Sequence, residues 1–312
     1  MHPSFGELFG EPVSAYFALL LFGYTIAIFS VVRWAKRTGH DHQSVIDCGL
    51  ASIIGGVLGG RLLHVLADGY LMDYVHLCTE PAKVGWHITQ AQCKSAEGGW
   101  DTVAKVCRPL ARDCLAWAKF YNGGLAYYGG LIGGTWAVWR IARRDKLPFL
   151  KLCDVTAVGV AMGLFFGRIG CFLAGCCYGE VTSRAVGTRF PAWSPASEGQ
   201  FREGLLAAPS LPSLPVHPTQ LYEAVGCLLI SVSLSWWWPR HKRFDGQVAL
   251  LALLAYAVLR SAIEVLRADD RGLYFGVSTS QWVSLGIALV SLYFWRRWSR
   301  PLSHVVVPRG LS

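Results

Sequence analysis

The sequence predicts an all-α, polytopic membrane protein with about seven transmembrane helices, and three observations lead to this class. Hydrophobic residues make up 53% of the 312 residues, whereas charged residues make up only 16%. The 34 glycines and 13 tryptophans are typical of packed transmembrane helices and of interfacial aromatic belts. Several apolar stretches also approach the length of about 20 residues that crosses a bilayer. The expected spans are residues 13–32, 44–67, 125–139, 152–178, 220–238, 247–266 and 278–295.

The basic residues predict how these spans are oriented. One set of alternate loops carries 15 Lys and Arg against three Asp, and the other set, with the N-terminus, carries 11 Lys and Arg against 13 acidic residues. An excess of Lys and Arg marks the cytoplasmic side. The N-terminus is therefore expected outside and the C-terminus in the cytoplasm. The net charge of +9 fits contact with anionic membrane lipids, and nothing in its distribution indicates a nucleic-acid partner.

The chain is expected to form a single transmembrane domain, residues 1–312, with two extracytoplasmic insertions at residues 68–121 and 179–218. The first insertion holds Cys78, Cys93, Cys107 and Cys114. Cysteines outside the cytoplasm favour disulfides, so two bridges are expected, and three pairings are open.

Arg168 is the only charged residue between residues 155 and 178. A guanidinium at membrane depth costs at least ~2.5 kcal/mol, so such residues face a polar interior or a partner. Arg168 therefore predicts a site for an anionic group inside the membrane.

A second polar group lies in the sixth span. Arg260, Glu264 and Arg267 have the spacing i, i+4, i+7 and are expected to share one helix face. An Arg260–Glu264 ion pair that locks helix packing is one interpretation. The other is an anion site, because one acid cannot neutralise two arginines. Arg61, near the outer end of the second span, either snorkels to the interface or joins such a site.

Other polar residues have simpler expected roles. Asp47 and Asp154 open their helices and are predicted to be N-caps. The glycine-rich stretch at residues 122–134, which includes Tyr127 and Tyr128, is either a helix-packing surface or a loop that offers backbone N–H groups to a ligand. His217 is more often structural than catalytic in such a place, and it is expected to point roughly the same way as Gln220 and Glu223.

Cysteines 171, 176 and 177 leave three interpretations open: packing as small apolar residues, a redox pair, or metal binding. The i, i+5 spacing of Cys171 and Cys176 is awkward for two ligands on one helix. Cys48, Cys153 and Cys227 are expected to pack as apolar residues.

Several segments together resemble the bacterial prolipoprotein diacylglyceryl transferase family. They are GGRL at 59–62, NGGLAYYGGLIGG at 122–134, GRIGCFLAGCCYG at 167–179, HPTQLYE at 217–223, LRSAIEVLRADD at 259–270 and STSQW at 278–282. Their order, their spacing and the N-out topology fit the family across most of the chain, apart from the long cysteine loop.

The resemblance implies transfer of the diacylglyceryl group of phosphatidylglycerol to the lipobox cysteine thiol of a preprolipoprotein, with glycerol 1-phosphate leaving. It also implies a multi-pass protein of the bacterial inner (plasma) membrane. Fixed guanidiniums in a low-dielectric site suit the charge that develops on the leaving phosphate, so no metal and no cofactor is expected. The expected catalytic residues are Arg168, Arg260, Tyr128 and Glu264. The expected substrate-binding residues are Arg168, Arg260, Tyr16, Arg61, Gly129, Gly130, Gly179, His217 and Gln220.

The chain departs from the family pattern at three positions. Tyr128 replaces a family His, Cys171 an Asn and Cys176 a Glu. Tyrosine, with an ordinary pKa near ~10, is a poor base, so the thiol proton passes to the lipid phosphate, to Glu264 or to His217. Two rival hypotheses follow: a membrane thiol–disulfide protein that uses Cys171, Cys176 or Cys177, and a catalytically altered lipid-binding relative.

Overall fold

The computed structural model of the protein describes residues 4–8, 11–39, 41–67, 71–86, 93, 98–104, 106–119, 126–267, 273–274 and 277–299. Contacts divide the chain into two compact units. Unit 1 comprises residues 1–40 and 148–312, and unit 2 comprises residues 41–147.

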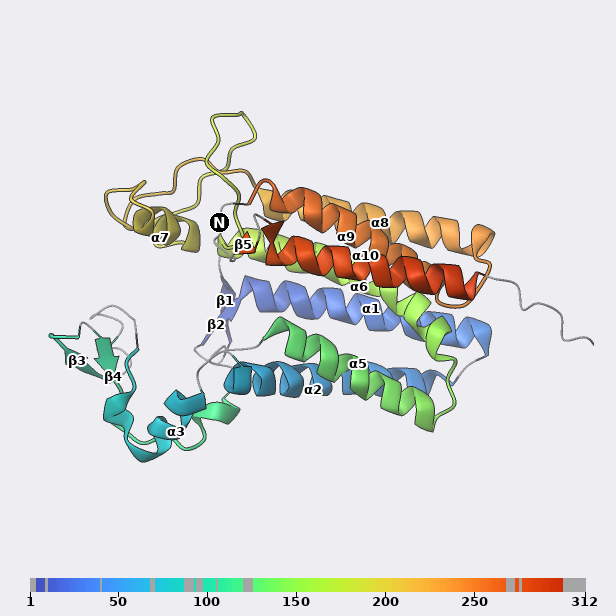
Figure 1. Ribbon diagram of the computed structural model, residues 1–312, viewed down its shortest axis with the longest axis horizontal. Coiled ribbons are helices and arrows are strands. Elements are labelled where there is room, and N and C mark those ends of the chain that lie inside the picture. Colours follow the sequence, from blue (N-terminus) through green and yellow to red (C-terminus); the bar gives the residue numbers. More distant parts are fainter. Residues whose placement is uncertain are drawn as a thin grey trace, which may run out of the picture. The chain divides into compact units, whose positions relative to one another are not determined.

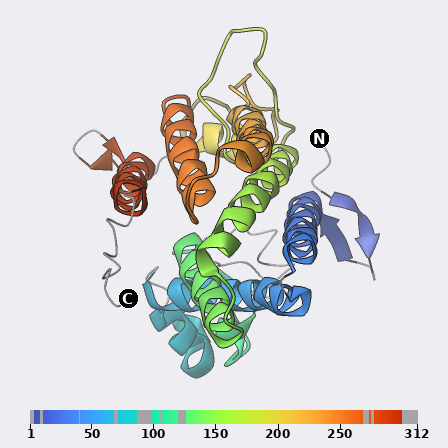
Figure 2. The same cartoon turned by 90° about the vertical axis from the view of Figure 1, so that its right-hand side faces the viewer.

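Unit 1 is a bundle of five long helices arranged around α6. These helices are α1 (Ala15–Thr38), α6 (Phe149–Ala174), α8 (Thr219–His241), α9 (Gln247–Glu264) and α10 (Thr279–Trp298). Helix α6 contacts α1, α8 and α9, and α9 also contacts α8 and α10 (Figures 1 and 2). Side chains from α6, α8 and α9 can therefore meet inside this unit.

Short elements complete unit 1. An antiparallel hairpin of β1 (Ser4–Leu8) and β2 (Glu11–Ser14) precedes α1. A second hairpin, β5 (Leu273–Tyr274) with β6 (Val277–Ser278), leads into α10. Ser278 then caps α10 in a capping box with Gln281, because each side chain accepts a backbone N–H of the other residue.

The predicted insertion at residues 179–218 folds over a small core of its own. Helix α7 (Pro195–Arg202) lies in this segment. Tyr178, Phe190, Ala196 and Val216 bury their side chains together, and Val216 forms β-bridges to two other parts of the segment. The segment is therefore held in place against the C-terminal end of α6.

Unit 2 is built on two helices, α2 (His42–Ala67) and α5 (Tyr127–Arg144), that approach each other closely through glycines. A methyl group at Gly59 would collide with the backbone of Gly129, and one at Gly133 would collide with that of Gly55. Small residues allow such close approach of transmembrane helices. The packing interpretation of the glycine-rich stretch is confirmed where the structure describes it, because Gly129 and Gly130 lie within the helix rather than in a loop.

The remaining elements of unit 2 come between α2 and α5 in the sequence. They are α3 (Leu71–Thr79), the 3-10 turns η1 (Pro81–Lys83) and η2 (Ala116–Ala118), and the antiparallel strands β3 (Gly99–Asp101) and β4 (Val106–Arg108). The expectation of two disulfides is confirmed, with the pairing Cys78–Cys114 and Cys93–Cys107. These bridges fasten a segment that has little core of its own.

All seven predicted spans fall on helices. Among the described residues, five helices are long and apolar enough to cross a membrane: α1, α2, α6, α8 and α9. The chain is therefore a helical membrane protein, and large apolar side chains cover the outside of these helices, as lipid contact requires. Examples are Leu21, Phe29, Ile54, Leu58, Leu229 and Val258.

Candidate functional site

Arg168 lies on α6 and forms an ion pair across the interior of unit 1. Its Nη2 atom is 3.0 Å from Oε1 of Glu223 on α8, and the side chains are 18% and 1% exposed. The hydroxyl of Tyr256 on α9 donates a hydrogen bond of 2.9 Å to the same carboxylate oxygen. One buried carboxylate thus joins three helices, and the arginine faces the polar interior that the cost of its charge requires.

Arg260 forms a second buried ion pair one turn after Tyr256 on α9. Its Nη2 atom lies 2.6 Å from Oε2 of Glu264 and donates a 3.1 Å hydrogen bond to Ser280 on α10. The predicted Arg260–Glu264 pair is confirmed. Among the described residues, no group accepts a hydrogen bond from the buried Nη1 atom of Arg260. A buried donor without a partner is costly, so this nitrogen is poised for an additional acceptor.

Arg267 does not share the helix face that its spacing predicted. Helix α9 ends at Glu264, and Arg267 lies in the following turn, where it forms a β-bridge with Gly179. Arg260 and Arg267 do not share a single acid inside unit 1, because Glu223 on α8 is a second buried carboxylate. In the interior of unit 1, Arg168 and Arg260 are therefore each paired with a carboxylate, and the buried Asp154 is paired with Lys242.

Tyr16 lies beside the same turn of α6. Tyr16 is the second residue of α1. A methyl group added to Gly170 would lie 2.9 Å from the Cα atom of Tyr16. The absence of a side chain at Gly170 therefore lets α1 approach α6 two residues after Arg168. This close approach brings Tyr16 to the Arg168 end of the bundle.

Gly179, His217 and Gln220 fasten the start of α8 to the segment after α6. The Gly179 N–H donates to the His217 carbonyl (2.9 Å), and Gln220 Nε2 donates to the Cys176 carbonyl (2.7 Å). A methyl group at Gly179 would lie 2.5 Å from the Leu266 carbonyl oxygen, so only glycine fits there. The Nδ1 of His217 pairs with the Tyr222 hydroxyl at 3.2 Å, whereas Glu223 pairs with Arg168.

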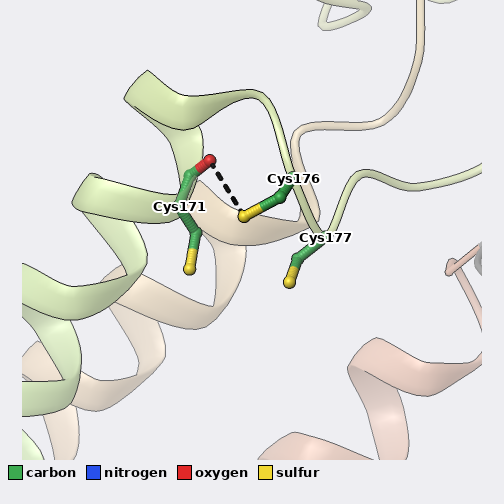
Figure 3. Close-up of side chains that lie close together, drawn as sticks. All are labelled: Cys171, Cys176 and Cys177. Atoms are coloured by element: carbon green, nitrogen blue, oxygen red, sulfur yellow. Dashed lines mark hydrogen bonds between the residues drawn. The ribbon is translucent and has the colours of Figure 1, made fainter. Parts of the chain in front are cut away.

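Three free thiols gather where α6 ends. The Sγ atoms of Cys171, Cys176 and Cys177 all lie within 4.8 Å of one another, and Cys176 Sγ contacts the Cys171 carbonyl oxygen at 3.7 Å (Figure 3). The i, i+5 spacing that is awkward on one helix does not apply here, because α6 ends at Ala174 and Cys176 lies beyond it. Cys48, Cys153 and Cys227 are free cysteines elsewhere in the chain.

The predicted site residues of unit 2 have structural contacts of their own. Arg61 is buried and donates hydrogen bonds to the carbonyls of Trp117 (2.6 Å) and Ala116 (2.7 Å), and its guanidinium lies 5.1 Å from the Tyr74 ring centre. It therefore anchors η2 rather than snorkelling to an interface. The side chain of Tyr128 lies outside the described residues.

The two aspartates predicted to cap their own helices do not do so. Helix α2 is capped by Asp41, whose carboxylate accepts the N–H groups of Gln43 and Ser44, whereas Asp47 lies 3.5 Å from Arg144. Asp154, within α6, caps α9 and not its own helix.

Asp154 is fully buried and caps α9. Its carboxylate accepts the N–H groups of Gly246 and Ala249, each at 2.9 Å, and lies 2.8 Å from Lys242 Nζ. Burial alone lowers the pKa of Lys242, but hydrogen bonds to Asp154 and Asp245 outweigh it and raise that pKa above its usual value. Asp154 is therefore a tertiary anchor that joins α6, α9 and the turn before α9.

Tyr256, Ser280 and the pairing of Glu223 with Arg168 were not predicted from the sequence. Glu223 carried a usable signal, because an acidic residue inside an apolar span needs a partner. Tyr256 precedes Arg260 by four residues, so both belong to one helix face. Ser280 carried no such signal, because a serine is common near a helix start.

Comparison of the sequence with known proteins places the chain in a family. Residues 3–297 match the family model described as prolipoprotein diacylglyceryl transferase. A Clostridium tetani protein named phosphatidylglycerol–prolipoprotein diacylglyceryl transferase is 29% identical over 293 residues, which cover 94% of this chain and 96% of that protein. A protein of the same name from Nitratidesulfovibrio vulgaris (strain DP4) is 33% identical over 287 residues, 90% and 87% of the two chains. The chain belongs to the prolipoprotein diacylglyceryl transferase family.

Proposed function

We propose that this protein transfers the diacylglyceryl group of phosphatidylglycerol to the thiol of the lipobox cysteine in a preprolipoprotein, the first covalent step of lipoprotein maturation. The family match covers nearly the whole chain, and the relatives' names state the donor lipid and the acceptor class. The proposed setting is the bacterial inner membrane, with seven spans, the N-terminus outside and the C-terminus in the cytoplasm.

Arg168 and Arg260 are the proposed ligands of the lipid phosphate. The observation that carries this role is the buried Nη1 of Arg260, which lacks an acceptor among the described residues. Phosphate oxygens accept strong, charge-assisted hydrogen bonds from guanidinium groups.

In the proposed reaction, the acceptor sulfur attacks the glyceryl carbon that bears the phosphate ester. The carbon–oxygen bond breaks, its electron pair stays on the phosphate oxygen, and glycerol 1-phosphate leaves. Guanidiniums that are already oriented stabilise this developing charge without reorganisation. Glu264 and Glu223 hold the two guanidiniums in place, and Tyr16 lines the Arg168 end of the site.

The thiol proton goes to the lipid phosphate, to Glu264 or to His217. The pairing of His217 with Tyr222 makes the histidine the weakest of these three candidates. Gly129, Gly130, Arg61, Gly179 and Gln220 stay predicted substrate-binding residues. Tyr128 stays a predicted catalytic residue, as a phosphate hydrogen-bond donor. Replacing Glu264 by Gln keeps its shape and removes its basicity, so loss of transfer with retained lipid binding would identify it as the base.

The direct test uses purified protein in phosphatidylglycerol liposomes with a lipobox peptide. The peptide is expected to gain the mass of one diacylglyceryl unit, and a peptide with Ser in place of Cys is expected to gain none. Arg260→Ala should abolish the gain, whereas Arg140→Ala, which removes an exposed arginine of α5, should not. Phosphatidylglycerol binding without turnover would instead support a catalytically altered lipid-binding protein.

A further inference from the structure

The thiol cluster of Cys171, Cys176 and Cys177 has no part in the proposed transfer reaction. The three Sγ atoms lie within 4.8 Å of one another, and no other group of three or more His, Cys, Asp or Glu residues with this geometry occurs in the described chain. Figure 3 shows the three side chains close together; Cys171 is buried and the other two are half-buried. Packing accounts for isolated cysteines such as Cys48 and Cys227, but it does not explain three thiols that converge on one point.

The backbone brings these thiols together through a Schellman turn. Gly175 adopts a left-handed conformation (φ 74°), its N–H bonds to the Phe172 carbonyl, and the Cys176 N–H bonds back to the Cys171 carbonyl. In this motif the residue after the glycine contacts the residue at the position of Cys171. Residues 171 and 176 are therefore neighbours because the helix ends between them.

Cys177 completes the cluster through an unusual backbone conformation. Its φ is 63°, a left-handed value that is uncommon for a residue other than glycine. Such a conformation persists only when the surrounding structure fixes it. Here the Thr219 hydroxyl donates to the Cys177 carbonyl (2.8 Å) and Gln220 holds the Cys176 carbonyl (2.7 Å). The start of α8 thus holds the two cysteines in place.

The donor set and its spacing match a metal site. Thiolate ligands select soft or borderline ions such as Zn²⁺ and Cu⁺. Zinc–sulfur bonds of ~2.3 Å at tetrahedral angles place the sulfurs about 3.8 Å apart, so three atoms within 4.8 Å need only a small contraction. Arg267 forms a β-bridge with Gly179, two residues after Cys177, and Arg168 is one turn from Cys171. Cationic residues near the cluster therefore offset the net negative charge of three thiolates around one ion.

The geometry points to a binding site for one thiophilic metal ion, Zn²⁺ or Cu⁺, held by the Sγ atoms of Cys171, Cys176 and Cys177. Three protein ligands leave a fourth position on Zn²⁺ for water or for an exogenous thiol. Binding displaces the thiol protons into solvent and involves no change of oxidation state. A disulfide is the competing outcome, but it joins only two of the three sulfurs and needs an oxidant.

The test is a metal titration of the full-length protein in detergent, after chelation and a mild reduction that leaves the Cys78–Cys114 and Cys93–Cys107 bridges closed. Cd²⁺, a spectroscopic substitute for Zn²⁺, is expected to give an ultraviolet thiolate-to-metal charge-transfer band that saturates at one ion per chain. Competition with a chromophoric chelator then gives the Zn²⁺ affinity. Neither readout depends on diacylglyceryl transfer, so this proposal and the proposed function fail separately.

Two triple variants provide the comparison. Replacing Cys171, Cys176 and Cys177 by Ala should abolish the band, whereas replacing Cys48, Cys153 and Cys227 by Ala should leave it unchanged. The single variant Cys176→Ala, at a half-buried position, should lower the Zn²⁺ affinity at least about 10-fold. This variant keeps the test valid if the triple variant does not fold. The proposal is overturned if the reduced wild-type protein shows no band, if the first triple variant retains it, or if thiol counting finds a disulfide within the cluster that persists under reduction.

Discussion

Unit 1 and unit 2 are stabilised in different ways. Unit 1 buries charge, through the pairs Arg168–Glu223, Arg260–Glu264 and Lys242–Asp154. Unit 2 is held by glycine contacts between α2 and α5 and by two disulfides. Its ion pairs range from half-buried ones such as Arg108–Asp101 to exposed ones such as Lys83–Glu80. Its one buried guanidinium, that of Arg61 among the described residues, is satisfied by backbone carbonyls.

This difference indicates that the reaction site lies in unit 1. Buried ion pairs contribute little net stability, because desolvation of both charges offsets their attraction. Unit 1 therefore carries an arrangement that stability alone does not favour, whereas unit 2 uses contacts that serve stability directly. Substitutions in the two units should accordingly have different consequences, and four comparisons test this contrast.

The largest expected effect is on activity, at Arg168. Arg168→Ala should lower transfer by about 10³-fold, because loss of a preorganised donor to a developing oxyanion costs roughly 10²–10³-fold and this donor is also charged. Peptide lipidation in phosphatidylglycerol liposomes measures it. Arg168→Ala also leaves Glu223 unpaired, so the double variant Arg168→Gln/Glu223→Gln serves as a neutral, similarly shaped control. Activity near the wild-type value in both variants would remove Arg168 from the site.

Asp154 should be the most sensitive position for stability. Asp154→Ala removes the ion pair to Lys242 and both hydrogen bonds to the start of α9. Breaking one side of a buried pair costs roughly 3–5 kcal/mol, measured as a fall in the thermal unfolding midpoint in detergent. Asp245→Ala is the matched control, because Asp245 also pairs with Lys242 but is 43% exposed. Equal effects of the two variants would contradict the anchoring role.

The disulfides of unit 2 should come next. Loss of Cys78–Cys114 is expected to cost roughly 2–4 kcal/mol, since a cross-link restricts the unfolded chain. The two bridges span 36 and 14 residues, so replacing Cys93 and Cys107 by Ser should cost less than replacing Cys78 and Cys114. Protease sensitivity and thermal unfolding of both double variants measure this order, and the reverse order would mean that native contacts of the loop outweigh chain entropy.

The glycine contact of α2 with α5 should give the smallest of these effects. Gly59→Ala places a methyl group against the Gly129 backbone and is expected to cost roughly 1–3 kcal/mol through overpacking. At Gly56, an added methyl group would lie 3.6 Å from the nearest atom, the Gly130 carbonyl oxygen, so Gly56→Ala should be tolerated. Thermal unfolding of the pair decides whether packing of these helices, rather than glycine content alone, stabilises unit 2.

The sequence predicted the helices well because lipid exposure imposes a simple rule. Every predicted span lies on a helix, and each predicted end is within six residues of the corresponding helix end in the structure. It also predicted the Arg260–Glu264 pair, which needs only the i, i+4 geometry of one helix. The larger errors arose where a helix ended early: α9 stops at Glu264, so Arg267 turns away, and α6 stops at Ala174, so Cys176 returns to Cys171.

The sequence by itself determined the class of protein, the helical segments and the charged residues that require partners inside the membrane, because hydropathy and the cost of buried charge are local properties. Only the tertiary structure decided which residues are those partners. Glu223 reaches Arg168 from another helix, Asp154 caps a helix 92 residues away along the chain, and α8 holds the two cysteines that complete the thiol cluster. Contacts of this kind depend on how helices pack, and periodicity along one helix carries no information about its neighbours.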